Sequence, residues 1–448
     1  MKQKSNAKLV EGDISKILYK MTLPMIVGIF GMIFFNLVDT YFIGLLGVDE
    51  LAAISFTFPV IMIVMSISMG LGIGASSVIS REIGTGNMDQ VKRYTTDVLI
   101  LSFAIVILLV ILGLFTLNPL FQLLGAKKEL IPLIRDYMII WYAGVPLVVI
   151  PMVGNSVIRA TGDTKSPGLI MMVAVLVNLI MDPLLIFGIG PFPRLELKGA
   201  AIATLIARAC VLIFAVYVLH RREKMISLQL PALKDLFHSW RKILYIALPI
   251  SLTNLIAPVT IAIITMLVAD YGKNAVAAFG ITSRLEMFSL VIVMALSTVI
   301  APFTGQNYGA KKYKRIIKGI QLSTNFSIIY GLVVMFFFIL FSKKIASIFT
   351  DNQEVVQHAQ FFLIILSVSY GANGIIKIAT SVFNAINKPL FSTILILFQM
   401  VILLIPMAFL GSKLYGLKGI FIACTLAHII SGFSAYFFIP WMCTKIKN

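Results

Sequence analysis

Long apolar stretches separated by short polar segments make up almost the whole chain. Each stretch has about 20 or more residues, which is the length an α-helix needs to cross a bilayer. The strands of a transmembrane barrel would instead alternate over roughly 10 residues. The pattern predicts an all-α polytopic membrane protein with twelve spans at residues 17–46, 51–80, 95–118, 130–158, 167–190, 198–220, 242–269, 275–302, 319–342, 356–385, 390–411 and 417–443.

The longest internal connection joins the sixth and seventh predicted spans and is strongly basic. It divides the chain into an N-terminal lobe (1–220), a cytoplasmic connecting loop (221–241) and a C-terminal lobe (242–448). Lys and Arg number 24 on the side of the termini and 10 on the opposite side, which predicts that both termini are cytoplasmic. No cleavable signal peptide is visible, so we expect the first span to act as its own insertion signal.

The two predicted lobes contain an internal repeat. Residues 47–84 align with residues 272–309 at a constant offset of 225, with 9 identities in 38 positions. Leu197-Lys198-Gly199 before the sixth span also recurs as Leu417-Lys418-Gly419 before the twelfth. Six spans return the chain to its starting side, so the repeats are parallel, and transporters place their pathway between such repeats.

Composition supports this class and excludes others. The chain is 59% hydrophobic and 12% charged, whereas soluble domains are about a quarter charged. Its net charge of +18 is explained by membrane topology, so we expect no nucleic-acid partner. Three cysteines are too few for a disulfide framework or a metal site. The sequence has no phosphate-binding loop, and Gly70, Gly72 and Gly74 lie inside a predicted span, where close helix packing explains them.

Two acidic residues of the N-terminal lobe, Asp39 and Asp182, lie at the same depth within predicted spans. Asp39 is 8 residues before Gly47, and Asp182 is 8 residues before Gly190, which places both about 12 Å below the outer surface. Asn178 shares a helix face with Asp182, and Thr204 enters the sixth span from the same side. Because an ionisable group at this depth costs at least about 2.5–3.5 kcal/mol, such groups usually serve a function.

These four side chains allow three interpretations. They are oxygen ligands for a small cation, a carboxylate pair that binds a proton, or hydrogen-bonding groups that hold helices together. The repeat disfavours the third interpretation, because Asp39 aligns with the apolar Ile264 of the other lobe. Arg208 follows Thr204 by one turn on the same helix face, where it can pair with Asp182 and hold it ionised, and its fixed positive charge would also weaken cation binding.

The C-terminal lobe has charges of its own. Arg284 and Glu286 lie in the eighth span on different faces, and Lys377 and His428 are embedded in the tenth and twelfth spans. Glu286 either attracts a cationic substrate or pairs with Lys377 or His428. In the first span, Pro24 either permits a bend that links ion occupancy to gating or is simply tolerated near the start of the helix.

Several motifs together resemble the multidrug and toxic compound extrusion (MATE) transporters of the MOP flippase superfamily. They are Asp39-Thr40-Tyr41-Phe42-Ile43-Gly44 with Leu51-Ala52-Ala53, Gly154-Asn155 with Arg159-Ala160-Thr161-Gly162-Asp163-Thr164-Lys165, Asn178-x-x-x-Asp182-Pro183, and Lys198-Gly199-Ala200-Ala201-x-Ala203-Thr204. The resemblance extends from about Ile14 to Thr444.

The resemblance implies two six-helix lobes that form a V-shaped cleft. It also implies a non-enzymatic antiporter that exports amphipathic, often cationic compounds against H⁺ or Na⁺, with no cofactor besides the coupling ion. In the DinF-like and archaeal branch, the N-lobe ion site would fall on Asp39, Asn178, Asp182 and Thr204, with Tyr137 and Asn155 as weaker matches. Pro24 matches a proline at which the first helix of that branch bends. Arg208 departs from the apolar residue expected there, which weakens Na⁺ coordination more than H⁺ coupling.

An alternative within the same superfamily is a flippase for lipid-linked oligosaccharides. It would need a strongly cationic cleft, to which Arg208, Arg284 and Lys377 could contribute. A passive channel is disfavoured because the spans lack a continuous polar stripe. We expect a monomer in a prokaryotic cytoplasmic membrane.

Overall fold

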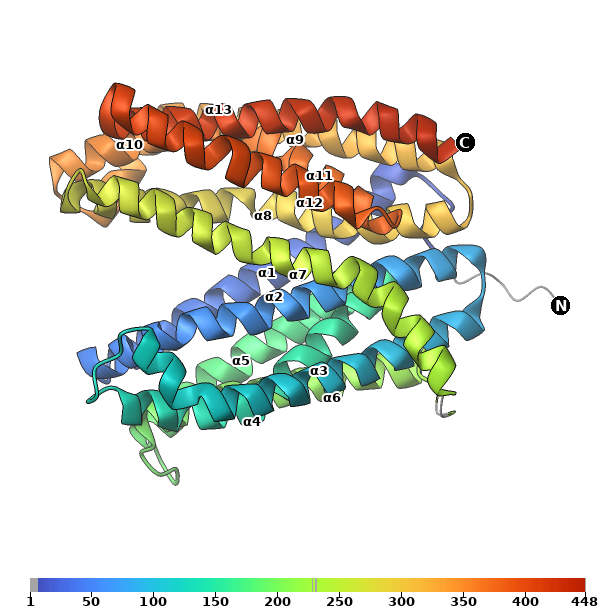
Figure 1. The fold of residues 1–448 in the computed structure, drawn as a ribbon, viewed down its shortest axis with the longest axis horizontal. Coiled ribbons are helices and arrows are strands. Elements are labelled where there is room, and N and C mark those ends of the chain that lie inside the picture. The colour runs from blue at the N-terminus through green and yellow to red at the C-terminus, as the bar shows by residue number, and fades with distance from the viewer. Residues whose placement is uncertain (1–6, 228, 230–231, 448) are drawn as a thin grey trace. The chain divides into compact units, whose positions relative to one another are not determined.

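The computed structural model describes residues 7–227, 229 and 232–447, and every regular element in this part of the chain is helical (Figure 1). The helices are α1 (Ile14–Gly44), α2 (Val48–Thr85), α3 (Met88–Leu123), α4 (Ile131–Ala160), α5 (Lys165–Phe187), α6 (Glu196–Tyr217), η1 (Val218–Arg222), α7 (Leu233–Ala269), α8 (Lys273–Gly309), α9 (Tyr313–Phe349), α10 (Gln353–Ser367), α11 (Tyr370–Ala385), α12 (Pro389–Leu397), η2 (Phe398–Leu404) and α13 (Ile405–Lys447). The predicted all-α fold is confirmed.

The helices account for twelve crossings of a bilayer. Ten described helical segments are long and apolar enough to span, and α10 with α11 forms an eleventh that bends by 50° at residues 368–369. One of the ten, Pro389–Ile439, has 51 residues, or about 76 Å of helix, which is more than two bilayer thicknesses. It breaks at Tyr415 and Gly416, where Gly416 has a φ of +60°. This break falls between the predicted spans 390–411 and 417–443.

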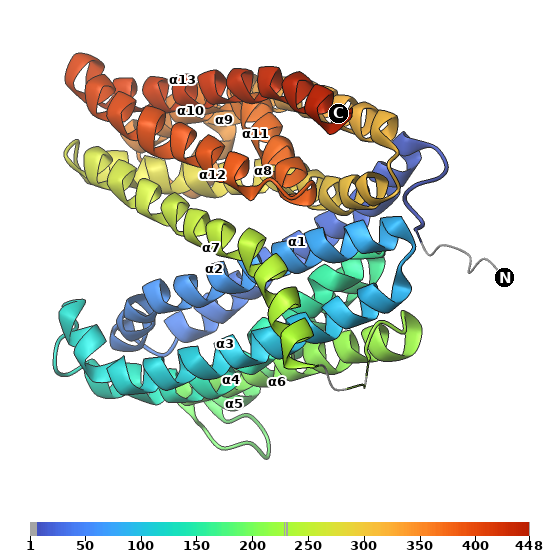
Figure 2. The ribbon, with the colours of Figure 1, turned by 45° about the vertical axis from the view of Figure 1, so that its right-hand side comes forward.

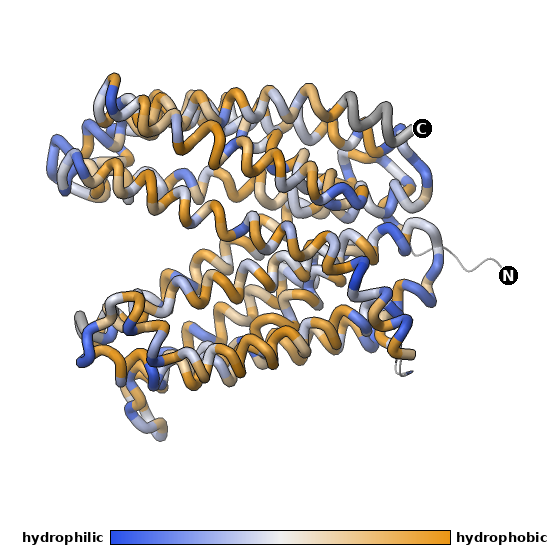
Figure 3. Tube along the Cα trace, in the orientation of Figure 1, coloured by the Kyte–Doolittle hydropathy of each residue, from blue (hydrophilic) through white to orange (hydrophobic). Residues whose placement is uncertain are grey.

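Hydropathy follows the helices as expected for a membrane protein. Apolar positions run along the helix bodies, and hydrophilic positions gather at helix ends and in the connections (Figure 3). The side chains that face outward include many large apolar residues, such as Phe115 and Leu340. A hydrocarbon environment accommodates such a surface, whereas water does not.

The internal repeat is visible in the helix boundaries. Helix α8 begins 225 residues after α2, and α9 begins 225 residues after α3, because the starts are Val48 and Lys273 for one pair and Met88 and Tyr313 for the other. In the N-terminal half α4 packs against α2, α3 and α6, and in the C-terminal half α11 packs against α8, α9 and α13. Both halves therefore place an equivalent helix at the centre of their packing.

The chain forms two compact units. Among the described residues, unit 1 comprises those of 7–8 and 23–251, and unit 2 comprises those of 9–22 and 252–447. Helix α1 therefore starts in unit 2 and ends in unit 1, and α7 starts in unit 1 and ends in unit 2. Figure 2 shows helices α8 to α13, in yellow to red, as one bundle. The boundaries 1–220, 221–241 and 242–448, which divide the sequence into its two repeated lobes and a connecting loop, stay a prediction.

The first half of α7 packs closely against other helices of unit 1. The Trp240 indole donates to the carbonyl of Asp97 at 3.0 Å, and the Lys242 ammonium donates to the Tyr94 hydroxyl at 2.7 Å. A Cβ atom at Gly74 would lie 2.9 Å from the Ile243 carbonyl oxygen. The glycine-rich stretch of α2 thus serves close helix packing, as the sequence predicted.

An N-terminal strap, residues Leu9–Gly12, is fastened to unit 2. The Leu9 amide donates to the Gln306 side chain at 3.1 Å, and the Asn307 amide donates to the Leu9 carbonyl at 3.1 Å. The Arg315 guanidinium donates to the Gly12 carbonyl at 2.9 Å and to the Asn307 side chain at 3.1 Å. The strap therefore fixes the start of α1 to the turn between α8 and α9.

We expect Arg315→Ala to loosen the strap, because it removes several hydrogen bonds from a charged donor, each of which contributes about 1.5–3 kcal/mol at most. Amide hydrogen exchange at residues 9–12 should accelerate, and the apparent melting temperature in detergent should fall by a few degrees. Lys314→Ala removes an exposed neighbouring charge and is the matched control. Unchanged exchange in the Arg315 variant would contradict the role of the strap.

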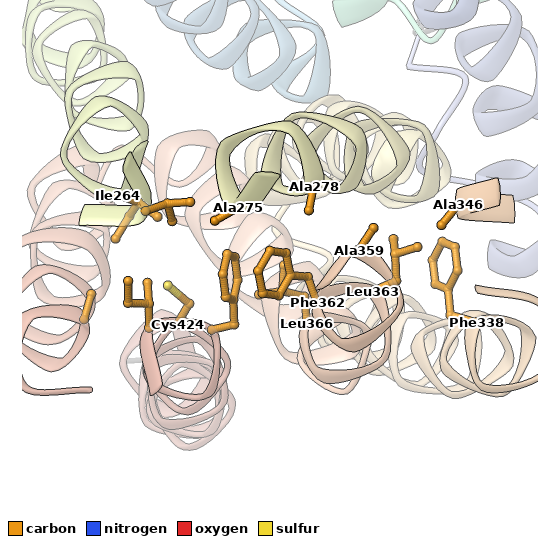
Figure 4. Packing of buried hydrophobic residues seen from close by; sticks show 14 of the residues in the cluster. Ile264, Ala275, Ala278, Phe338, Ala346, Ala359, Phe362, Leu363, Leu366 and Cys424 are labelled. Carbon is orange, nitrogen blue, oxygen red and sulfur yellow. The ribbon is translucent and has the colours of Figure 1, made fainter. Parts of the chain in front are cut away.

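Unit 2 has an extensive apolar core. Phe338, Phe362 and Leu363 pack with small residues such as Ala278 and Ala359 (Figure 4). Ile264, which the repeat aligns with Asp39, is 5% exposed and lies in this core. The position that carries an acid in unit 1 is therefore apolar in unit 2.

Candidate functional site

The two candidate acidic residues of unit 1, Asp39 and Asp182, lie close together. Asp182 on α5 is fully buried at 0% exposure, and Asp39 on α1 is half-buried. The two carboxyl groups are near enough to interact electrostatically. Tyr137 on α4 is 6% exposed, and its phenol interacts with both carboxyl groups. Helices α1, α4 and α5 thus converge on one site.

Hydrogen bonds satisfy only part of this site. The Asn178 amide donates to Asp182 Oδ1 at 2.9 Å, and the Thr204 side chain of α6 lies near the Asp39 carboxyl group. Asp39 Oδ1, Asp182 Oδ2 and Asn178 Oδ1 have no hydrogen-bond partner although all three atoms are buried. Unpartnered buried oxygen atoms are costly, so a bound proton or hard cation would stabilise this arrangement.

Arg208 on α6 adds a positive charge to the site. Its guanidinium lies over the Phe35 ring at 4.7 Å from the centroid and interacts electrostatically with Asp39. Its Nε atom has no hydrogen-bond partner. From the sequence, Asp182 was the expected partner of Arg208. In the structure, Arg208 lies toward Asp39 instead.

Two other predicted residues of unit 1 lie elsewhere. Asn155 is buried at 5% exposure, but it follows Tyr137 by 18 residues on α4, or about 27 Å, so these two residues do not share one site. Pro24 is inside α1 and is the second residue of that helix in unit 1. A Cβ atom at Gly168 of α5 would lie 2.7 Å from the Pro24 carbonyl oxygen, so α1 and α5 pack tightly there.

The embedded charges of unit 2 are arranged differently. Glu286 and Lys377 interact electrostatically, while Arg284 is exposed on another face of α8. His428 is 9% exposed, and its Nδ1 is 2.7 Å from the Gln399 Nε2. Of the two partners that the sequence offered Glu286, the structure therefore favours Lys377, and His428 contacts an amide instead.

Sequence reasoning missed three polar groups. Asp97 is fully buried and accepts from Arg93 Nε at 3.0 Å, a pair that the spacing of four residues could have indicated. Gln399 gave no such signal, because its partner His428 is 29 residues away. Tyr370 is 1% exposed with an unpartnered hydroxyl, and only the packing of unit 2 reveals it.

The chain is similar over nearly its whole length to known transporters. The MatE family model matches residues 24–184 and 249–410, two segments whose starts are 225 residues apart. The chain is 41% identical over 439 residues to a protein of Shewanella oneidensis named FAD transporter, covering 98% of this chain and 97% of that one. It is 26% identical over 428 residues to the multidrug export protein MepA of Staphylococcus aureus, covering 95% and 93%. Its fold matches the bent form of the Vibrio cholerae MATE transporter VcmN with a TM-score of 0.91 at 32% identity, covering 99% of both chains.

Proposed function

The chain belongs to the MATE family of transporters, and on that basis we propose that it is a proton-coupled exporter whose ion site lies in unit 1. Members of this family are transporters and not enzymes. The observation that carries the proposal is the pair of neighbouring carboxyl groups, Asp39 and Asp182, with unpartnered buried oxygen atoms. The resemblance found in the sequence assigns coupling to the same residues.

Coupling requires that the ion bind one conformation better than the other. Protons that enter from outside would bind at Asp39 and Asp182 and stabilise the conformation with low affinity for substrate. A coupling free energy of about 1–3 kcal/mol is typical of such linkage. Inward movement of one proton supplies about 2.3 kcal/mol per 100 mV of membrane potential. We propose that both termini are cytoplasmic and that the transporter works as a monomer in the plasma membrane.

A proton fits this site better than Na⁺. Arg208 interacts with Asp39 and is a fixed positive charge next to the proposed site. The Arg208 charge repels a Na⁺ ion at the site. A proton instead neutralises a carboxylate through a covalent bond and needs no coordination shell. With two carboxylates and one arginine, one carboxylate can also pair with Arg208 while the other binds the proton.

We expect Arg208→Met to change the ion preference, because Met is a long side chain that can occupy the space over the Phe35 ring without the positive charge of the guanidinium. Na⁺ binding should tighten by about tenfold or more, or about 1.4 kcal/mol. Titration of Na⁺ against intrinsic tryptophan fluorescence measures this, and Arg284→Met on the exposed face of α8 is the control. Equal Na⁺ affinity in wild type and the Arg208 variant would contradict the charge argument.

The relatives support candidate substrate classes. The 41% identity to an FAD transporter over nearly the whole chain favours a flavin dinucleotide, an aromatic and amphipathic compound. The weaker similarity to MepA supports a second candidate, the amphipathic and often cationic drugs that the sequence suggested. The third candidate is a flippase for lipid-linked oligosaccharides. If the protein is such a flippase, deletion of its gene would perturb the cell envelope and leave the efflux of dyes unchanged.

The decisive experiment is transport by the full chain in proteoliposomes. FAD and the cationic dye ethidium are loaded separately, and a pH gradient or a Na⁺ gradient is then imposed. We expect FAD movement driven by the pH gradient and little response to Na⁺. Transport driven only by Na⁺ would overturn the choice of proton, and movement of ethidium without FAD would assign the second candidate substrate.

A further inference from the structure

Helix α7 is longer than a bilayer requires. Its 37 residues correspond to about 55 Å of helix, whereas the hydrocarbon layer is about 30 Å thick. Residues 243–269 contain no Asp, Glu, Lys, Arg or His, so this part of α7 is the one that suits the hydrocarbon. The start of α7, residues 233–242, is rich in charged residues and therefore lies at the level of the lipid headgroups.

The packing of α7 on α3 fixes which side of this start is turned outward. Leu236 and Ser239 are buried at 8% and 2% exposure. The Trp240 indole, one residue further along, donates to the Asp97 carbonyl of α3 at 3.0 Å. These contacts lie on one side of α7, so the opposite side of its start is turned away from the helices of unit 1.

Four exposed side chains form a stripe on that outward side. Lys234, Phe237, Arg241 and Tyr245 follow one another at intervals of three or four residues, so they share one helix face. All four are exposed, Phe237 at 62% and Tyr245 at 48%. Lys234 and Arg241 are two helical turns apart, or about 10 Å. This α7 stripe presents two positive charges and two aromatic rings on one face.

The protein itself neutralises another basic residue of the same region. Arg222 pairs with Asp163 and, at 3.0 Å, with Glu223. Within the part of the chain that the structure describes, neither Lys234 nor Arg241 takes part in a salt bridge. The charges of the α7 stripe are therefore available to an anionic group from outside the protein.

Neighbouring ionisable groups on α7 do not cancel this charge. Asp235 is the one acidic residue in the sequence 233–242, and it lies about 100° around the helix from Lys234 and about 120° from Arg241. His238 is exposed about 40° from Lys234, and its protonation can only add positive charge. The face that carries the stripe is therefore positively charged.

Apolar residues continue the stripe toward the middle of α7. Leu248 and Leu252 lie on the same face and are 59% and 60% exposed. Nearer the start, the Phe237 ring packs edge to face on Trp240, with the centroids 5.6 Å apart. The outward face thus changes from aliphatic side chains to a mixture of aromatic and basic ones. A phospholipid has the same order, from its acyl chains to the interface and the phosphate group.

We propose that the α7 stripe binds the headgroup of an anionic phospholipid. Lys234 and Arg241 attract the phosphate group, while Phe237 and Tyr245 pack against the interfacial part of the lipid. A zwitterionic lipid carries the same phosphate together with a cation, so its net attraction to the stripe is weaker. With both termini in the cytoplasm, the lipid belongs to the cytoplasmic leaflet. The inference is independent of the substrate and of the coupling ion.

The test compares two lipids that differ only in the headgroup. The full chain in a mild detergent is titrated with phosphatidylglycerol or with phosphatidylcholine of the same acyl chains, and native mass spectrometry measures the bound lipid. A basic residue near an anionic headgroup contributes about fivefold to binding. The wild type should therefore bind phosphatidylglycerol about tenfold or more tightly than phosphatidylcholine. Lys234→Gln combined with Arg241→Gln should reduce this preference to about twofold or less.

A second double variant separates the site from net charge. Lys311→Gln combined with Lys314→Gln removes two exposed charges around the turn between α8 and α9 and should keep the wild-type preference. Circular dichroism and thermal unfolding check that both variants are folded.

Three results would overturn the proposal. They are equal binding of the two lipids by the wild type, an unchanged preference in the Lys234 and Arg241 variant, and an equal loss of preference in both double variants. A wild-type dimer that the Lys234 and Arg241 variant loses, without any lipid preference, would instead assign the α7 stripe to a second copy of the chain.

Discussion

Asp182→Asn is expected to reduce transport driven by a pH gradient strongly while the protein still inserts and folds. Asn keeps the volume of Asp182 and can accept the hydrogen bond from Asn178, so packing on α5 is preserved. The substitution removes the charge that would bind a proton beside Asp39. Loss of the coupling should reduce gradient-driven FAD accumulation in vesicles by about 5- to 150-fold. Exchange of FAD at equal concentration on both sides, which needs no coupling, should persist.

The control for this prediction is another acid at the outer end of the same lobe. Asp136 on α4 pairs with Lys198 at 3.0 Å, and both side chains are about half exposed, at 48% and 50%. Exposed pairs of this kind contribute about 0–1 kcal/mol, so Asp136→Asn should transport normally. Wild-type accumulation by the Asp182 variant would remove the basis of the proposed coupling site.

Gly199→Ala is expected to destabilise the protein and to impair transport at the same time. A Cβ atom at this position of α6 would lie 2.6 Å from the Leu185 carbonyl carbon and 2.9 Å from the Ile186 nitrogen, both backbone atoms of α5. Backbone atoms cannot move aside as a side chain can, so α5 and α6 would have to separate. Overpacking of this kind costs about 1–3 kcal/mol and occasionally more.

The same shift would reach the candidate ion site, because Asp182 is one turn from Leu185 and Thr204 is five residues from Gly199. Thermal unfolding in detergent and FAD transport measure the two effects. Gly280→Ala, in α8, is the control, since no atom lies within 4 Å of a Cβ atom there and its φ is not positive. Wild-type stability of the Gly199 variant would show that α5 and α6 have room to adjust.

Gly199 also shows how a repeat in the sequence acquires a physical meaning. Its counterpart Gly419 packs against Gly411, and a Cβ atom there would lie 2.6 Å from the Gly411 carbonyl carbon. The sequence predicted only that Leu-Lys-Gly recurs before the sixth and twelfth spans. The structure gives the reason, which is that both glycines lie where two helices approach closely.

The candidate ion site could be predicted to a large extent. The depth of Asp39 and Asp182, the helix face of Asn178 and the entry side of Thr204 follow from helical rise and periodicity. Depth and helix face are each set within a single helix, and the membrane surface is the plane from which the depth is measured. The separation of Asn155 from Tyr137 was also available from the sequence, because the two residues are 18 positions apart in one predicted span, or about 27 Å, although the motif match alone does not use this distance.

By itself the sequence determined the membrane class, the positions of the twelve spans, the parallel repeat and the depth of the embedded charges, because the hydrocarbon layer imposes length and polarity on each segment separately. Only the tertiary structure decided which helices contact one another. It placed Arg208 toward Asp39, Gln399 against His428 and Lys377 near Glu286 without a direct pair. These relations depend on the rotation and crossing of helices that are far apart in the chain, and no periodicity within a single helix specifies them.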